Sequence, residues 1–510
     1  MKQVLITTSG LGQRLGELTK FTNKSLVRVG KKPALAYIIE SHKNAEFIIT
    51  IGHYGDLVKQ FIKIAYPNLN VKFVEVDNYD QPGSSLGYSI LKAKEFINGP
   101  FIFNSCDTIV FENIPDPTFN WLGGFKSINN SHYTSYDVYN DNIINIKSKG
   151  ATNSQYNYIG LAGIYNWKEF FEELEKIYNE NKYDSSLSDC NAINAIINNK
   201  FKSIEFKTWL DIGNIESLNS ARNIISDKFN ILDKLDESIY LYEDKVIKFF
   251  ANKEIANNRV TRGKSLYPLT PKIIDSTDNF YSYEFTEGET LSKVIDTTKF
   301  SKLLLWAKHK LWKPIKSDKD IYKLCYDFYL LKTWKRADEY LKKYNLNDSS
   351  YKINGIEVPK LHDLLINPEL IGLYKLVFAG QFHGDFILEN IIETDEFKLI
   401  DWRQDFASSL DVGDIYYDLA KLNHNLIFDH DIVNNKHYYI SENECDILRR
   451  SKLADCQEVL FKFLEENELS VKKVKMLTAL IWINMAALHE NPLDHFLFNF
   501  GKYHLFRAIS

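Results

Sequence analysis

The sequence predicts an α/β domain built on a parallel sheet, followed by a two-lobed domain with a small β lobe and a large α lobe. Before residue 225, short apolar runs alternate with helix-like segments, a pattern typical of βαβ units. After it, short strands broken by charged turns give way, from about residue 291, to long aromatic-rich helices. The chain, at 510 residues, also exceeds the roughly 250–300 residues that one hydrophobic core holds. We therefore place the domains at residues 1–225 and 226–510, with lobes at 226–290 and 291–510.

Composition excludes several classes of protein. An apolar fraction of 45% with 25% charged residues is typical of a folded, soluble chain. The five cysteines are scattered and form no Cys-x-x-Cys pair, which argues against a disulfide framework or a zinc site. A net charge of −5 without a basic block argues against a nucleic-acid partner. No apolar run is long enough for a membrane span or a signal peptide, so we expect a cytoplasmic protein without membrane insertion; whether it forms a homo-oligomer stays open.

The expected secondary structure of the first domain brings a glycine loop to the end of its first strand. An apolar, β-rich run at residues 4–8 leads directly into Ser9-Gly10-Leu11-Gly12-Gln13-Arg14, after which we expect a helix. Main-chain N–H groups in such a loop can converge on a phosphate where the helix dipole is positive. Taken alone, the pattern is also compatible with an ordinary tight turn. Further strands are expected at 47–51, 71–76 and 101–103, and helices at 33–44 and 55–65.

The longer string carries more information. Gly-Leu-Gly-Gln-Arg-Leu at residues 10–15, with Lys-Ser-Leu-Val at 24–27, resembles the signature of the sugar-nucleotide pyrophosphorylases, which include the phosphocholine cytidylyltransferases. The resemblance implies a Rossmann-like nucleotidyltransferase domain. In it, Gly10 and Gly12 wrap the phosphates of a nucleoside triphosphate, while Arg14 and Lys24 stabilise the charge that develops at the α-phosphorus. The sequence departs from the family pattern at Gln13, Glu17 and Asn23, which leaves the substrate open.

Two aspartates extend this resemblance. Asp107 follows the strand that starts at Phe101, and Asp211 lies in Trp-Leu-Asp-Ile-Gly, which is similar to the family's Trp-x-Asp-x-Gly motif. Two carboxylates together with phosphate oxygens suffice for Mg²⁺, so the resemblance implies that this pair binds the metal. The alternative for Asp107 alone is a solvated carboxylate at the end of a strand. Between the two, the resemblance implies a loop that reads the base, with Gln81, Gly83 and Ser84 as candidates; a plain serine-capped glycine turn is the alternative.

A second set of polar residues lies in the C-terminal half. Asp385 is followed five residues later by Asn390, and Asp401 ends a short apolar strand. Phosphoryl transfer needs a carboxylate at the acceptor hydroxyl and ligands for Mg²⁺. The His-Gly-Asp string and the later Ile-Asp-Trp resemble the catalytic loop of the choline kinase and aminoglycoside phosphotransferase family. That resemblance implies a bilobal protein-kinase-like fold with Asp385 as catalytic base and with Asn390 and Asp401 on Mg²⁺.

Other residues receive roles from the same resemblance. His383 braces the loop, and Asp418 is a buried structural acceptor. Upstream, Lys248 would contact the ATP phosphates and pair with Glu254, and the segment around Glu284 would be the hinge whose backbone contacts adenine. The turn at residues 235–238 lacks the glycine-rich loop expected of an ATP site, with Ser238 as a substitute.

Together the two resemblances predict a bifunctional enzyme. The kinase would phosphorylate a small alcohol or amino alcohol with ATP, and the other domain would couple the product to a nucleotide, with CTP as first choice, for bacterial surface polysaccharide. One alternative is an anomeric sugar kinase joined to a UTP- or dTTP-dependent nucleotidyltransferase; another is a non-catalytic nucleotide sensor. Trp482 and Phe496 with Glu490 and Asp494 could hold a cationic acceptor, although aromatics at helical spacing also form cores.

Overall fold

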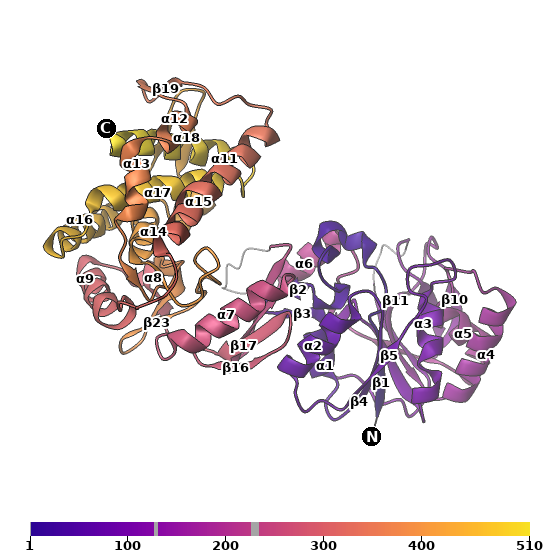
Figure 1. Ribbon diagram of the computed structural model, residues 1–510. Helices are drawn as coiled ribbons and strands as arrows, with labels where there is room; N and C mark the ends of the chain where they lie inside the picture. Colours follow the sequence, from indigo (N-terminus) through magenta and orange to yellow (C-terminus); the bar gives the residue numbers. More distant parts are fainter. Residues whose placement is uncertain (1, 127–130, 226–233) are drawn as a thin grey trace. The chain divides into compact units, whose positions relative to one another are not determined.

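The structure is a computed structural model that describes residues 2–126, 131–225 and 234–510 (Figure 1). The chain forms two compact units. The first comprises residues 1–256 and 274–285, and the second comprises residues 257–273 and 286–510. The predicted boundary at residue 226 lies outside the described residues, so the division into 1–225 and 226–510 stays a prediction.

A nine-stranded sheet forms the centre of the first unit, in the order β5-β4-β1-β6-β11-β8-β12-β10-β9. Its first four strands are parallel, with Leu5 paired to Ile48 on one side and to Phe103 on the other. β11 then runs antiparallel to β6. The remaining strands pair in both parallel and antiparallel directions. The α/β class is confirmed, and the four strands that the sequence predicts, β1, β4, β5 and β6, pair in parallel. The sequence did not predict the antiparallel strands beyond β6. The strands are β1 Gln3–Thr7, β4 Glu46–Ile51, β5 Val71–Glu75, β6 Phe101–Ser105, β8 Trp121–Phe125, β9 Ser135–Tyr139, β10 Asn142–Lys147, β11 Tyr156–Ile164 and β12 Lys202–Glu205.

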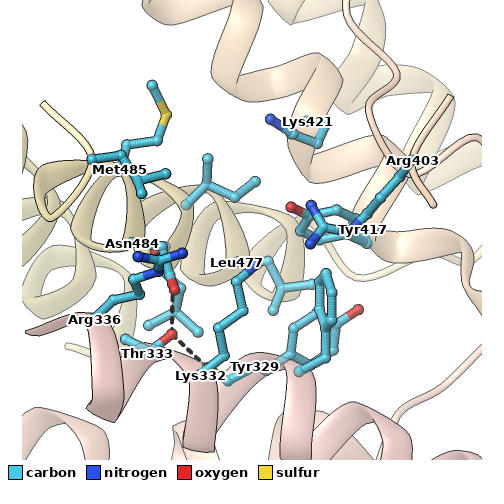
Figure 2. Close-up of a pocket in the computed structure, with 14 residues that line it drawn as sticks. Tyr329, Lys332, Thr333, Arg336, Arg403, Tyr417, Lys421, Leu477, Asn484 and Met485 are labelled. Carbon is cyan, nitrogen blue, oxygen red and sulfur yellow. Dashed lines mark hydrogen bonds between the residues drawn. The ribbon is translucent and has the colours of Figure 1, made fainter. Parts of the chain in front are cut away.

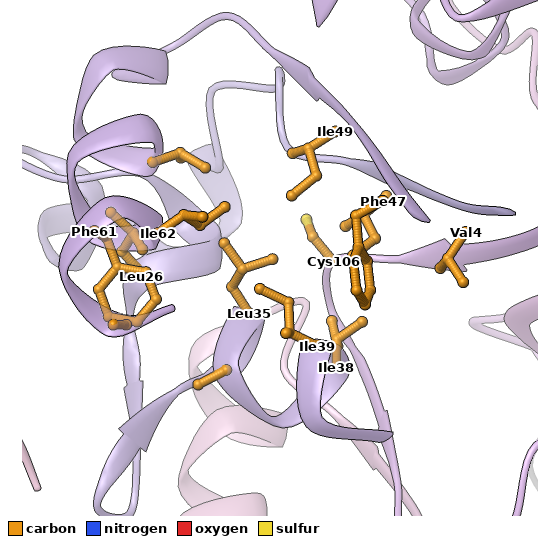
Figure 3. Packing of buried hydrophobic residues seen from close by; sticks show 14 of the residues in the cluster. Val4, Leu26, Leu35, Ile38, Ile39, Phe47, Ile49, Phe61, Ile62 and Cys106 are labelled. Atoms are coloured by element: carbon orange, nitrogen blue, oxygen red, sulfur yellow. The ribbon is translucent and has the colours of Figure 1, made fainter. Parts of the chain in front are cut away.

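Successive residues of a strand point to opposite faces of a sheet, and in these strands both sets are apolar. Helices therefore cover both faces of this sheet. Val4 and Ile6 of β1 belong to a core with Leu35 and Phe61 of α1 and α2 (Figure 3). Leu5, between them, belongs to a separate core that includes residues of α3, α4 and α5. Two short pairs complete this region, β2 Arg28–Val29 with β3 Lys32–Pro33 and β7 Thr108–Val110 with β13 Trp209–Asp211. The helices are α1 Ala34–Ser41, α2 Gly55–Ala65, α3 Leu86–Lys92, α4 Trp167–Glu180, α5 Asp189–Ala195 and α6 Ile215–Ile225.

A four-stranded sheet, in the order β14-β15-β17-β16, packs against α2. The Phe61 ring lies 5.5 Å from the ring of Tyr240 and 6.2 Å from that of Phe280, measured between centroids. The buried Tyr240 hydroxyl donates a hydrogen bond to the carbonyl oxygen of Leu26, 2.7 Å away. The two sheets therefore share a core through α2. The strands are β14 Glu237–Leu241, β15 Lys245–Phe250, β16 Ile273–Ser276 and β17 Phe280–Glu284.

The second unit is mainly helical, as its aromatic-rich sequence predicts. Helix α17, which is buried over most of its length, packs against α18, α14 and α11. The unit also contains short strands, and the hairpin of β22 and β23 leads directly to Asp401. No helix in the described ranges is long and apolar enough to cross a membrane. The longer helices are α7 Lys253–Leu266, whose last ten residues belong to this unit, α9 Thr297–Trp306, α11 Lys332–Lys343, α14 Ile415–Ile427, α16 Ser451–Glu466, α17 Val471–Ala486 and α18 Leu493–Ile509.

The shorter elements of the second unit connect these helices. A π-helical stretch, Asp327–Leu331, joins α10 to α11. The short helices are α8 Leu291–Val294, α10 Ile321–Tyr326, α12 Leu361–Leu365, α13 Pro368–Gly372 and α15 His430–Asn434. The short strands are β18 Glu289–Thr290, β19 Tyr351–Ile353, β20 Ile356–Val358, β21 Ala379–Gly380, β22 Ile391–Glu393, β23 Phe397–Leu399, β24 Gly413–Asp414, β25 Tyr438–Ile440 and β26 Cys445–Ile447.

Candidate active sites

The glycine loop follows β1, as predicted, and its two glycines differ in their surroundings. A Cβ on Gly10 would meet no atom within 4 Å, so a ligand can approach the backbone there. Gly12 has a φ of +68° and packs against Thr19 and Lys24. The segment that follows, Gln13–Thr19, is a 3-10 helix interrupted at Gly16 (φ +54°), and not the α-helix that the sequence predicts. The loop is therefore not followed by the α-helix dipole that the sequence analysis expects, and phosphate binding by Gly10 and Gly12 stays a prediction.

Asn23, a departure from the family pattern, anchors the loop. Its side chain is fully buried, and its amide nitrogen donates to the carbonyl oxygens of Thr8 (2.8 Å) and His53 (2.6 Å). Its amide oxygen accepts from the main-chain N–H of Ser25 at 2.9 Å. These bonds hold the chain on both sides of Lys24, a role that the sequence alone does not reveal.

Lys24 and Asp107, far apart in the sequence, form an ion pair. Lys24 Nζ lies 2.5 Å from Asp107 Oδ2, and Ser105 donates a hydrogen bond to the other oxygen of the carboxylate. Burial raises the pKa of Asp107, but the charge and hydrogen bond of Lys24, with help from Ser105 and Arg14, outweigh it and hold the pKa at about 2. The carboxylate is therefore ionised at neutral pH and beside two cations.

Asp211 and Arg14 converge on the same place. The position that a Cβ on Gly213 would occupy lies 3.0 Å from Asp211 Oδ1, 3.4 Å from Asp107 Oδ2 and 3.5 Å from Arg14 Nη2. Asp211 Oδ1 accepts from the N–H of Gly213 at 2.8 Å, and Oδ2 accepts from the Tyr133 hydroxyl at 2.9 Å. Each carboxylate oxygen keeps a lone pair for a metal. Within the described ranges no cluster of three or more His, Cys, Asp or Glu could hold a metal, so Mg²⁺ fits here only with two protein carboxylates and phosphate oxygens.

A pocket of about 440 Å³ brings most of the predicted residues of the first site together. Six of them line it: Gly10, Gly12, Arg14, Lys24, Ser84 and Asp107. Further polar lining residues come from β1 and the turn after it, from β6, and from α3 and the loop before it: Thr7, Thr8, Ser9, Tyr79, Ser85, Ser89 and Ser105.

The predicted base-reading loop only partly reaches this pocket. Ser84 lines it and donates a hydrogen bond to the carbonyl oxygen of Tyr79 (2.7 Å). Gln81 is exposed and lies outside the lining. Gly83 has a φ of +92°, and a Cβ there would come within 2.6 Å of the carbonyl oxygen of Lys182. Gly83 is therefore required by the turn, and direct contact of Gln81 or Gly83 with a base stays a prediction.

The second site is built on the loop between β21 and β22. The side-chain amide of Asn390 donates to the carbonyl oxygen of Asp385 (3.0 Å) and to its Oδ2 (3.2 Å). In the described part of the chain no hydrogen bond reaches Asn390 Oδ1, so this oxygen suits a cation. His383 is buried and its Nε2 lies 3.0 Å from the carbonyl oxygen of Ile400, next to Asp401. This contact agrees with the bracing role predicted for His383.

Buried charged side chains hold this loop from behind. Asp418 on α14 accepts the main-chain N–H groups of His383 (2.7 Å) and Gly384 (2.6 Å), and burial raises its pKa to about 6. Arg262, which is also buried, donates to the carbonyl oxygens of Phe382 and His383, and its guanidinium lies 3.9 Å from the Phe382 ring. Asp418 occupies the structural position that the sequence predicts, whereas Arg262 has no recognisable motif.

Two further cations contact the predicted catalytic carboxylates. Lys421 Nζ lies 2.7 Å from Asp385 Oδ1. Burial raises the pKa of Asp385, but Lys421 outweighs it and lowers the pKa below the ordinary value. Asp401, with a φ of +55°, pairs with Arg259 through Nη1 and Oδ1 at 2.5 Å. Metal binding by Asp401 and Asn390 stays a prediction.

The upstream candidates belong to the first unit. Lys248 is a buried residue of β15, and Glu284 ends β17 opposite Lys245. Glu254 is exposed at the start of α7, and its pairing with Lys248 stays a prediction. Ser238 lies within β14, paired with Phe249, instead of in a turn. The roles of Lys248 and Glu284 in nucleotide binding stay predictions.

The predicted cation-binding wall is part of the core. Trp482 and Phe496 are 1% and 0% exposed, and their rings pack on Phe500. Asp494 is also buried, where it accepts from Tyr344 (2.5 Å) and Lys343 (3.2 Å). Glu490 is exposed and pairs with Lys343. The core alternative is therefore correct for both aromatics, and this group does not form an acceptor pocket.

A different pocket, of about 170 Å³, lies beside Lys421 (Figure 2). Its polar lining comes from α11, α14, α17 and the segment after Asp401: Lys332, Thr333, Arg336, Arg403, Tyr417, Lys421 and Asn484. Its apolar lining includes Phe328, Leu477, Leu480, Ile481, Met485 and Leu488. The sequence did not indicate this group, because its members are scattered over four segments.

Comparisons with known proteins bear on the N-terminal half. No family model matches the chain. Bifunctional protein GlmU of Methanococcus maripaludis is 25% identical over 255 residues, which are 48% of this chain and 60% of that protein. The chain therefore spans about three fifths of the length of this relative.

Similar solved structures include three enzymes. The CTP:phosphocholine cytidylyltransferase LicC of Streptococcus pneumoniae has 19% identity and a TM-score of 0.40, over 44% of this chain and 100% of that one. A UDP-glucose pyrophosphorylase has 17% identity and a TM-score of 0.38, over 44% and 98%. The inositol-1-phosphate CTP transferase of T. maritima has 16% identity and a TM-score of 0.37, over 45% and 98%. The kinase-like fold of the C-terminal half stays a prediction.

Proposed function

We propose that this chain is a bifunctional enzyme in which the C-terminal half phosphorylates a small alcohol with ATP and the N-terminal half joins the phosphomonoester to a nucleotide. The observation that supports it best is the convergence of Arg14, Lys24, Asp107 and Asp211 beside the glycine loop. Two cations and two carboxylates around one small space are what a nucleotidyl transfer requires.

In the first site, the glycine loop would receive the triphosphate through its main-chain N–H groups. A phosphate oxygen of the phosphomonoester attacks the α-phosphorus, the bond between the α-phosphorus and its bridging oxygen breaks, and pyrophosphate leaves. Arg14 and Lys24 would stabilise the negative charge that builds up on the α-phosphate. Asp107 and Asp211 would hold Mg²⁺, which would supply charge neutralisation for the phosphates. Asp107 would also keep Lys24 protonated and oriented, since the pair raises the pKa of the lysine despite its burial.

In the second site, Asp385 would accept the proton of the acceptor hydroxyl. The hydroxyl oxygen would attack the γ-phosphorus of ATP, the bond between the γ-phosphorus and its bridging oxygen would break, and ADP would leave. Asp385 can act as a base because Lys421 keeps it ionised. Asn390 and Asp401 would hold Mg²⁺, which would neutralise charge on the ATP phosphates. Lys248 and Glu284 remain the nucleotide-binding candidates that the sequence analysis offers. Asp418 and Arg262 would keep the loop in place.

The order of the two reactions follows from their chemistry. The kinase produces a phosphomonoester, and the nucleotidyltransferase consumes one. We keep CTP as the first choice of nucleotide and an activated alcohol for bacterial surface polysaccharide as the product. The buried state of Trp482 and Asp494 removes the reason for preferring a cationic amino alcohol.

A panel of initial rates tests this proposal. The full chain would be assayed for pyrophosphate release with CTP, UTP, dTTP and GTP against choline phosphate, glycerol 3-phosphate and glucose 1-phosphate, and for ADP release with ATP and the matching alcohols. We expect both products, with CTP the fastest nucleotide. A preference for UTP or dTTP with glucose 1-phosphate would move the chain to the sugar alternative. No turnover in either assay would contradict an enzymatic role and favour a nucleotide sensor.

A further inference from the structure

The pocket beside Lys421 is unusually basic. Four of its lining residues are cations, contributed by three different segments: Lys332 and Arg336 on α11, Arg403 after Asp401, and Lys421 on α14 (Figure 2). Among the residues that the structure describes, no acidic side chain lines the pocket. Lys421 links it to the proposed catalytic base, because its Nζ lies 2.7 Å from Asp385 Oδ1.

Only part of this charge is neutralised by the protein. Lys421 pairs with Asp385, and Arg336 pairs with Glu339 on its own helix at 2.9 Å. Within residues 2–126, 131–225 and 234–510, neither Lys332 nor Arg403 forms an ion pair. Both instead lie against the Phe328 ring, with Lys332 Nζ 4.4 Å and Arg403 Cζ 5.0 Å from its centroid.

The cations are close enough to repel one another. Burial, followed by repulsion from Arg403, Lys421 and Arg336, lowers the pKa of Lys332 well below its ordinary value, and Asp405 opposes this only in part. Gathering like charges in a partly buried pocket costs free energy unless an anion joins them. A bound anion would relieve that repulsion, whereas an ammonium group would add to it.

We propose that this pocket binds the anionic end of the acceptor alcohol, so that the kinase substrate is a small hydroxy acid or an alcohol that already carries a phosphate. This inference rests on the proposed kinase function. Lys332 and Arg403 would bind the acid group, and the hydroxyl would extend past Lys421 towards Asp385. A guanidinium and an ammonium together suit a carboxylate or phosphate by geometry and by charge.

The size and lining of the pocket restrict the acceptor further. A volume of about 170 Å³ holds a few heavy atoms beyond the acid group, so a short carbon chain fits and a disaccharide does not. Leu477, Leu480 and Ile481 offer an apolar surface for that chain. Asn484 and Tyr417 offer polar atoms for a second hydroxyl, and Asn484 is oriented by its hydrogen bond to Thr333 (2.6 Å).

The test compares acceptors of three charges on the full chain. D-glycerate, gluconate and glycerol 3-phosphate are the anions, glycerol and glucose are neutral, and choline and ethanolamine are cations; ADP release is measured with saturating ATP. We expect kcat/KM for the best anion to exceed that for the best cation by about 100-fold. The anion gains an attractive charge pair and the cation lacks one, and each difference should change kcat/KM by roughly tenfold or more. A cation preferred over every anion would overturn the inference while leaving the kinase function intact.

Two variants connect the preference to the pocket. Lys332→Gln removes one unpaired cation, and Lys335→Gln is the matched control, an exposed lysine on the same helix outside the pocket. We expect Lys332→Gln to raise the KM for the anion about tenfold or more with little change in kcat or in the rate with glycerol. Equal KM values for Lys332→Gln and wild type would overturn the inference.

Binding without catalysis separates the two proposals. Calorimetric titration of the three anions into the full chain needs no phosphoryl transfer. If no acceptor of any charge is phosphorylated, the kinase proposal fails, yet saturable anion binding that is weakened in Lys332→Gln and kept in Lys335→Gln would still support an anion site. Absence of binding for all three anions would overturn the site itself.

Discussion

The side chain of Lys421 contacts Asp385 with an Nζ–Oδ1 distance of 2.7 Å. Lys421 lies on α14, three residues after Asp418, which accepts the main-chain N–H groups of His383 and Gly384. Residues three apart on a helix face the same side. One helix face thus holds the backbone of the loop and the carboxylate that the loop presents.

Lys421→Met should impair the kinase reaction and change its pH dependence. Lys421 holds the pKa of Asp385 below its ordinary value against the effects of burial and Asp401. Without the lysine the pKa of Asp385 rises, so the acid limb of kcat/KM moves to higher pH, and the rate near neutral pH falls by about tenfold or more. ADP release measured between pH 5 and pH 8 checks this. Lys475→Met, at an exposed position of α17, is the control, and an unshifted acid limb in Lys421→Met would contradict the role assigned to the pair.

Gly10→Ala should weaken nucleotide binding without destabilising the fold. The added Cβ would meet no protein atom within 4 Å, and it would occupy space in the pocket where the triphosphate is proposed to lie. We expect the free energy of unfolding to stay within about 0.5 kcal/mol of the wild type, and the KM for the nucleotide to rise several-fold. Gly99→Ala serves as the control because its Cβ also meets nothing within 4 Å and lies outside the pocket. Unchanged nucleotide KM in Gly10→Ala would place the triphosphate elsewhere.

The stability of the first unit should depend on pH through Asp107. Its pKa of about 2 lies below the value of an unfolded chain, near 3.9, so the carboxylate stabilises the folded state above about pH 4 and loses this effect as the pH falls towards 2. The difference in Tm between the wild type and Asp107→Asn should therefore be largest at pH 5 or above and should shrink by pH 3. Calorimetric scans across this range measure it; a difference that grows as the pH falls would show that Asp107 has a raised pKa.

Local patterns predicted much of the first unit. The apolar run before Gly10 forms β1, and α2 begins at Gly55 and ends at Ala65, as predicted. Both could be predicted because the spacing of apolar residues and the residues that end an element are local properties of the sequence. The direction of β11 was not predictable in that way, since pairing depends on which strand edge remains available. The 3-10 segment after Gly12 was missed because the local sequence pattern does not indicate the positive φ of Gly16.

The residues of the candidate sites also divide into those that the local sequence reveals and those that only the packing reveals. Asp107, Asp211, Asp385 and Asn390 could be singled out because the resemblances include them in short strings. Lys421, Arg262 and Lys332 carry no such string, and only the packing of α7, α11 and α14 around the loop reveals them. Trp482 was misleading for the opposite reason, since an aromatic stripe has the same spacing in a core as in a binding wall.

The most direct test of two independent catalytic sites is ³¹P NMR of complete reactions with ATP, CTP, Mg²⁺ and the best acceptor from the screen. The wild-type chain should yield ADP, pyrophosphate and a nucleoside-diphosphate-linked alcohol. Asp107→Asn should stop at the phosphomonoester, and Asp385→Asn should form the final product only when that phosphomonoester is supplied. If either substitution abolished both reactions while circular dichroism showed a folded chain, the account of two separate sites would be contradicted.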